Sequence, residues 1–83
     1  MKSHIRISSL TRSELEAILD EGNFSQEQEQ VFRLLNKDEL FDIGIIQKLG
    51  LSKDHYYDVK GVVLSKVERI ATARGFISSI YRR

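Results

Sequence analysis

Two helical patterns separated by a three-residue turn constrain this chain more than any other feature. Apolar residues recur every three or four positions on both sides of Gly50-Leu51-Ser52, which is the spacing of a helix with one buried face. Gly50 lacks a Cβ and can take the left-handed conformation that ends a helix. Ser52 can accept a hydrogen bond from the first free N–H groups of the next helix. The pattern predicts a short helix ending at Leu49 and a long helix beginning at Lys53.

The apolar positions of these two helices predict which faces are buried. The two stripes that we expect to pack across the turn are Ile45, Ile46 and Leu49 before it and Tyr56, Val59, Val63, Val67 and Ile70 after it. The opposite face of the long helix carries Asp54, Tyr57, Asp58, Gly61 and Ser65. Such residues have little reason to be buried, so we expect that face to meet solvent or a ligand.

Two further helices are predicted upstream by their capping sequences. Thr11–Glu14 and Ser25–Gln28 both match the capping box, in which a hydroxyl and a side chain three residues later satisfy each other's backbone donors. We expect helices from after Thr11 to Gly22, from Gln26 to Leu35, from Glu39 to Leu49, and from Lys53 to Gly75. Their buried residues are expected to include Leu15, Ile18, Leu19, Val31, Phe32, Leu34 and Leu35. The predicted fold is all-α, a small bundle of four or five helices that contains a helix-turn-helix within residues 11–75.

The two ends of the chain are predicted to lie outside this helical domain. Residues 1–10 alternate loosely around Ile5 and Ile7 and could form a short strand, an ordered arm or a frayed terminus. As an arm, they could bring His4 and Arg6 to a phosphate. The tail, residues 76–83, is rich in large apolar side chains, so it must fold back, pair with another chain or stay partly exposed. A homodimer formed through this tail is therefore one candidate assembly.

Composition argues against several classes of function. The 83 residues contain no cysteine, which excludes disulfides and thiolate metal sites. The two histidines, His4 and His55, do not have the spacing of metal ligands. Asp54 and Asp58 lie one helical turn apart with no nucleophile or implied cleft, so we expect no catalysis. We also expect no cofactor, no membrane span and no secretion signal, which together predict a cytoplasmic protein.

Charge is divided unevenly along the chain, although its net value is only +1. Residues 11–42 hold nine acidic and three basic residues, whereas residues 43–83 hold eight basic and three acidic ones. The basic half includes the predicted helix-turn-helix. Since polyanion binding requires local positive charge, we expect attraction to double-stranded DNA that falls steeply with salt, with ordinary uneven surface charge as the alternative explanation.

Three segments resemble region 4 of sigma-70-type factors, the helix-turn-helix domain that reads the promoter −35 element. They are SQEQEQVFRLL (Ser25–Leu35), IIQKLGLS (Ile45–Ser52) and VVLSKVERI (Val62–Ile70), in the family's order and at about its spacing. The resemblance implies a sequence-specific DNA-binding transcriptional regulator whose recognition helix, about Lys53–Ile70, lies in the major groove. The chain has no room for region 2, so it resembles free-standing proteins of bacteria and mobile elements.

This sequence also departs from the family pattern. Ile46 stands where the family usually has a small residue. Asp54, Asp58 and the Tyr56-Tyr57 pair replace the basic and small polar residues that are typical of the recognition helix. These differences bear on the DNA sequence that is read, not on the predicted helices.

Position on the long helix assigns roles in DNA contact. Lys53, Asp54, Tyr57 and Asp58 are predicted to face base edges, where a carboxylate can accept from cytosine N4. Lys60, Lys66 and Arg69 are predicted to contact phosphates, and Lys53 and Lys60 to offset the two carboxylates. The complete predicted set is Ser52, Lys53, Asp54, His55, Tyr57, Asp58, Lys60, Gly61, Lys66 and Arg69.

A protein–protein adaptor is the alternative function. Region-4-like domains also dock on RNA polymerase or on anti-sigma partners. In that case the acidic first and second helices are the expected working surface. The carboxylates concerned are Glu14, Glu16, Glu27 and Glu29.

Overall fold

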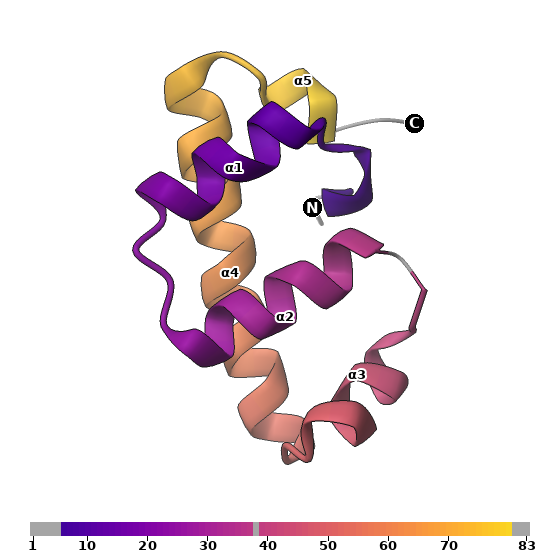
Figure 1. Ribbon diagram of the computed structural model, residues 1–83. Helices are drawn as coiled ribbons and strands as arrows, with labels where there is room; N and C mark the ends of the chain where they lie inside the picture. The colour runs from indigo at the N-terminus through magenta and orange to yellow at the C-terminus, as the bar shows by residue number, and fades with distance from the viewer. Residues whose placement is uncertain (1–5, 38, 81–83) are drawn as a thin grey trace, which may run out of the picture.

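The longest helix, α4 (Lys53–Arg74), is the element against which the other helices are packed. The computed structural model describes residues 6–37 and 39–80, and Figure 1 shows α1 and α2 lying across α4. The described elements are η1 (Ile7–Ser9), α1 (Arg12–Glu21), α2 (Gln26–Lys37), α3 (Asp42–Leu49), α4 and the one-turn α5 (Ile77–Ile80). The described chain is thus an all-α protein of four main helices and contains no strand.

The core confirms the apolar stripe predicted for α4. Its five positions are all buried, and they meet buried side chains from each of the other main helices. The core residues of the other main helices are Ile18 of α1, Val31 and Phe32 of α2, and Ile45 of α3. The remaining predicted positions of α1 and α2 are partly buried against this core. Burial of apolar area is the main driving force for this arrangement.

Both predicted capping boxes are present. Thr11 Oγ1 accepts from the Glu14 N–H at 3.2 Å, and the Thr11 N–H donates to Glu14 Oε1 at 2.9 Å. Ser25 and Gln28 make the same reciprocal pair at 3.2 and 3.1 Å. Phe24, just before this second box, lies 5.4 Å from the Phe32 ring between centroids. The starts of α1 and α2 are therefore set by local sequence.

Two helix boundaries differ from the prediction. Helix α2 continues to Lys37 instead of stopping at Leu35. Asn36, predicted to begin a turn, lies inside the helix, where its side chain donates to the Ile7 carbonyl at 2.9 Å. Helix α3 begins at Asp42 rather than Glu39, because Phe41 is extended. Phe41 offers no side-chain cap, and α3 is instead stabilised by contacts with α4.

The two ends of the described chain meet each other. The segment that could have been a strand forms the single 3-10 turn η1 and buries Ile7. The Arg6 N–H donates to the Ile80 carbonyl at 2.8 Å. Gly75 has a φ of 84°, which turns the chain back so that Ile80 is fully buried, and Figure 1 shows α5 returning to the N-terminal turn.

This return of the chain determines where the apolar residues of the tail pack. The described part of the tail packs against the core of its own chain, with Ile80 buried and Phe76 and Ile77 partly buried. A homodimer formed through the tail stays a prediction. His4 and residues 81–83 lie outside the described residues. None of the described helices is both long enough and apolar enough to cross a bilayer.

The buried position of Ile80 predicts that the tail contributes to stability. We expect Ile80→Ala to lower the free energy of unfolding by about 2–4 kcal/mol, because it leaves a cavity in the core. Urea denaturation followed by circular dichroism measures this, with Ser78→Ala in the same turn as the exposed control. Equal stability of the two variants would show that the tail is not packed on the core.

Candidate nucleic-acid interface

The turn between α3 and α4 has the predicted geometry. Gly50 has φ 67° and ψ 32°, the left-handed conformation that ends α3, and the Leu51 N–H donates to the Ile46 carbonyl at 3.2 Å. Leu51 packs against the core. Ser52 Oγ accepts from the His55 N–H at 3.2 Å and caps α4. The turn therefore sets where α4 begins and in which direction it leaves.

A polar cluster around Asp42 connects the start of α3 to α4. The Tyr56 hydroxyl donates to Asp42 Oδ1 at 2.6 Å, and Lys60 Nζ lies 3.0 and 3.1 Å from the two carboxylate oxygens. The Tyr57 hydroxyl is 3.4 Å from Oδ2. Since Asp42 is in the first turn of α3, the helix dipole also favours its negative charge.

This cluster shifts two pKa values. Burial by itself raises the pKa of the Asp42 carboxyl, but the hydrogen bonds from Tyr56 and Lys60 and the charge of Lys60 outweigh burial, so the pKa is lowered. Burial, followed by the adjacent Asp42 carboxylate, raises the pKa of the Tyr56 phenol far above its ordinary value. Asp42 is therefore ionised and Tyr56 protonated at neutral pH.

Lys60 has a role that the sequence did not indicate. It was predicted to contact phosphate and to offset the carboxylates of the long helix. The structure pairs it with Asp42, and its side chain is only 25% exposed. Its charge is thus balanced inside the fold and does not compensate Asp54 or Asp58.

Lys66 is likewise engaged within the protein. Its Nζ donates to the Asn23 carbonyl at 3.2 Å and to Gln28 Oε1 at 2.9 Å, and lies 5.1 Å from the Phe24 ring centroid. It therefore ties α4 to the connection between α1 and α2. These partners are 43 and 38 residues away in sequence, so a local pattern could not have found them.

His55 contacts two elements, through its backbone and through its ring. Its N–H completes the cap on Ser52, as expected for a residue at the start of α4. Its ring turns toward α2, where Nε2 lies 2.7 Å from Glu27 Oε1. The ring therefore links the start of α4 to the first turn of α2.

The remaining predicted residues lie together on the exposed face of α4. Lys53, Asp54, Tyr57, Asp58 and Arg69 are exposed, and a Cβ added to Gly61 would meet nothing within 4 Å. Lys53 and Arg69 form no ion pair with any described residue. Lys66 also lacks an ion pair among the described residues, but its ammonium group is hydrogen-bonded to two neutral oxygens of the protein, whereas Lys53 and Arg69 are exposed.

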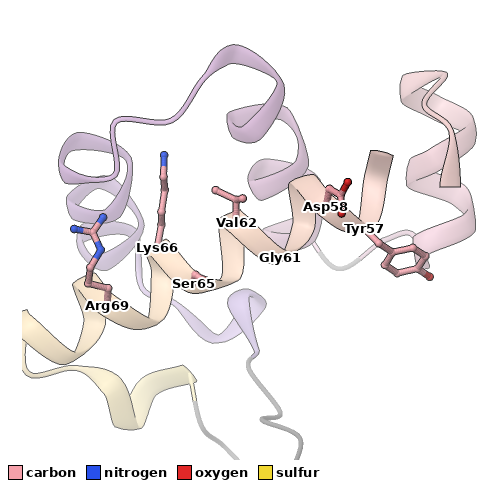
Figure 2. A pocket seen from close by; sticks show the side chains of 7 residues that line it. All are labelled: Tyr57, Asp58, Gly61, Val62, Ser65, Lys66 and Arg69. Atoms are coloured by element: carbon pink, nitrogen blue, oxygen red, sulfur yellow. The ribbon is translucent and has the colours of Figure 1, made fainter. Parts of the chain in front are cut away.

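A shallow open pocket of about 550 Å³ lies along this face. Figure 2 shows its lining, with Tyr57 and Asp58 toward one end of the helix and Lys66 and Arg69 toward the other. Val62 and Ser65 lie between them. Val62 was not among the predicted contact residues, although its position off the apolar stripe and one turn after Asp58 indicated that it is exposed.

Exposed apolar side chains gather at the start of α3. Phe41 is 88% and Ile43 is 61% exposed, and Leu40 is also exposed. They flank Asp42, whose carboxylate contacts Tyr57, so this apolar patch adjoins the α4 face. The prediction had placed Leu40 and Phe41 inside a helix and did not identify the patch.

Comparison of the chain with protein-family models, with curated proteins and with solved structures finds no match. The assignment of a function therefore depends on the residues and geometry described above.

The Asp42 cluster predicts a pH-dependent loss of stability. The folded-state pKa of Asp42 is lowered, so its stabilisation is complete above the unfolded pKa of about 3.9 and is lost as pH falls through the folded value. We expect Asp42→Asn to lower the free energy of unfolding at pH 7 by about 1–3 kcal/mol, because it weakens two hydrogen bonds to a charged group.

Urea titrations at neutral and acidic pH measure this effect. The gap between the wild type and Asp42→Asn should close at acidic pH. Asp58→Asn, which changes an exposed carboxylate on α4, is the matched control and should stay near the wild type at both pH values. A gap that is independent of pH would contradict the assigned ionisation of Asp42.

Proposed function

We propose that the protein binds double-stranded DNA through the exposed face of α4, as a transcriptional regulator of the sigma-region-4-like helix-turn-helix type. The observation that carries this proposal is an exposed strip at the start of α4, made of Lys53, Asp54, Tyr57 and Asp58. The N-terminus of this helix is capped by Ser52 and follows directly on the glycine turn. An α-helix of about 10–12 Å diameter fits the major groove, which is about 12 Å wide. In this arrangement the first residues of α4 reach the base edges.

The attachment of α3 supports this function. A reading helix must be held at a constant angle, since small errors in position cost hydrogen bonds to the bases. The glycine turn and the Asp42 cluster hold α4 from two points, one at each end of α3. The bare backbone at Gly61 allows close approach of the next turn of α4 to the DNA.

The chemistry of the strip favours particular bases. Asp54 and Asp58 can accept hydrogen bonds from the amino groups of cytosine or adenine, and they repel the acceptor edge of guanine. Tyr57 and Val62 offer apolar surface for a thymine methyl group. Lys53, adjacent to Asp54, supplies a cation that offsets the carboxylates, and both Lys53 and Arg69 contact phosphate.

The internal pairing of other cations changes the expected salt dependence. Lys60 pairs with Asp42 and Arg74 with Glu21, and Lys66 is hydrogen-bonded, so much of the basic charge of this half is used inside the fold. Lys53 and Arg69 are the two predicted contact cations on α4 whose ammonium or guanidinium groups are not used inside the fold, so the slope of log affinity against log salt is expected near about −2, which is shallower than the basic composition predicts.

A protein-docking adaptor is the second candidate, and the exposed apolar patch of Leu40, Phe41 and Ile43 favours it. Each carboxylate of the acidic surface expected to serve this function contacts another group of the protein. Glu27 contacts His55, Glu29 pairs with Arg33 and Glu16 with Arg12, while Glu14 completes a capping box. Because the pairs of Glu16 and Glu29 are exposed and weak, these carboxylates can still meet a partner, and the apolar patch adds a second surface for docking on RNA polymerase.

The first test is selection of bound sequences from a pool of random duplexes. We expect an enriched motif with cytosine or adenine opposite the two aspartates. Lys53→Gln and Arg69→Gln should each weaken binding uniformly and reduce the salt slope by about 1. Arg12→Gln removes an equal charge from α1 and should leave binding nearly unchanged.

A charge reversal at Lys60 or Lys66 is a poor test, because it also removes internal contacts. Absence of any enriched motif, with loss of binding to purified RNA polymerase on Phe41→Ser, would favour the adaptor over DNA reading.

A further inference from the structure

A second groove lies between α1, α2 and the residue that follows η1. Its volume is about 460 Å³, and no α4 residue lines it. Leu10, Leu15 and Leu19 form an apolar floor. Leu15 and Leu19 are one helical turn apart on α1, and all three are only partly buried against the core. This leaves apolar surface that a ligand can cover.

The rim of the groove is positively charged in an otherwise acidic segment. Residues 11–42 contain only three basic residues, Arg12, Arg33 and Lys37, and all three line this groove. Among the described residues that line the groove, Glu16 is the one carboxylate. The fold has therefore gathered every cation of the acidic half at one place, although they are up to 25 residues apart in sequence.

These cations can bind a ligand with only a small loss of the free energy contributed by their present ion pairs. Arg12 pairs with Glu16 at 3.5 Å and Arg33 with Glu29 at 2.8 Å, both as exposed pairs within one helix. Such pairs stabilise a protein by about 0–1 kcal/mol, so a ligand carboxylate can replace them. Lys37 forms no ion pair with any described residue and lies in the last turn of α2. Arginine also binds carboxylates in a bidentate manner.

We propose that this groove binds an acidic amphipathic segment of a partner protein. The apolar side chains of the segment cover Leu10, Leu15 and Leu19, and its carboxylates meet Arg12, Arg33 and Lys37. Charge complementarity identifies this occupant, because a basic or neutral segment would leave the rim cations unpaired. The groove shares no residue with the α4 pocket, so DNA and the partner can be bound together. The inference does not depend on DNA binding.

The test is selection from a display library of short random peptides on the immobilised full chain, followed by amide chemical-shift mapping with an enriched peptide. We expect enriched peptides that combine acidic and large apolar residues, with shift changes centred on Leu15, Leu19 and Lys37. Replacing Arg33 and Lys37 together by Gln should weaken binding roughly tenfold, because two charge-assisted contacts are lost.

Matched variants separate this site from the DNA surface. Arg69→Gln should leave peptide affinity unchanged, and the Arg33 and Lys37 double variant should keep its DNA affinity. The proposal is overturned if no peptide is enriched, if the enriched peptides are basic, or if shift changes map to Leu40, Phe41 and Ile43. Concentration-dependent shift changes at the groove without peptide would also overturn it, by showing that a second copy of the chain occupies the site.

Discussion

Burial of one face of α4 is the constraint on which the rest of the structure depends. Every main helix contributes to the cover of this face, and the short terminal elements η1 and α5 close the same core. A domain of this size buries a limited apolar area, so the loss of even a small part of the core lowers its stability appreciably. The terminal turns are therefore part of the folded unit, as the hydrogen bond between Arg6 and Ile80 illustrates.

Because one face of α4 is used for the core, the opposite face is left free along the helix. The exposed positions Tyr57, Asp58 and Gly61 follow from the same periodicity that buries Tyr56, Val59 and Val63. A single helix thus buries one face in the core and leaves the other exposed. Two of its cations, Lys60 and Lys66, make contacts that support the fold.

Helix α3 is attached to α4 by polar contacts as well as by apolar packing. Its exposed apolar residues show that the helix is covered on one side only, through Ile45 and its neighbours. Asp42 supplies the second attachment through Tyr56 and Lys60. A hydrogen-bonded charge is directional, so this contact constrains the angle between α3 and α4 more closely than apolar burial alone.

The sequence by itself determined the all-α class, both capping boxes, the turn at Gly50-Leu51-Ser52 and the buried stripe of α4. These features depend on contacts within about four residues, which a local pattern records. Only the tertiary structure decided the partners of Lys60, Lys66 and His55, the return of the tail, and the gathering of Arg12, Arg33 and Lys37 around one groove. Each of these joins residues far apart in the chain. Such pairings arise from the packing of helices against one another, and no periodicity within one helix encodes them.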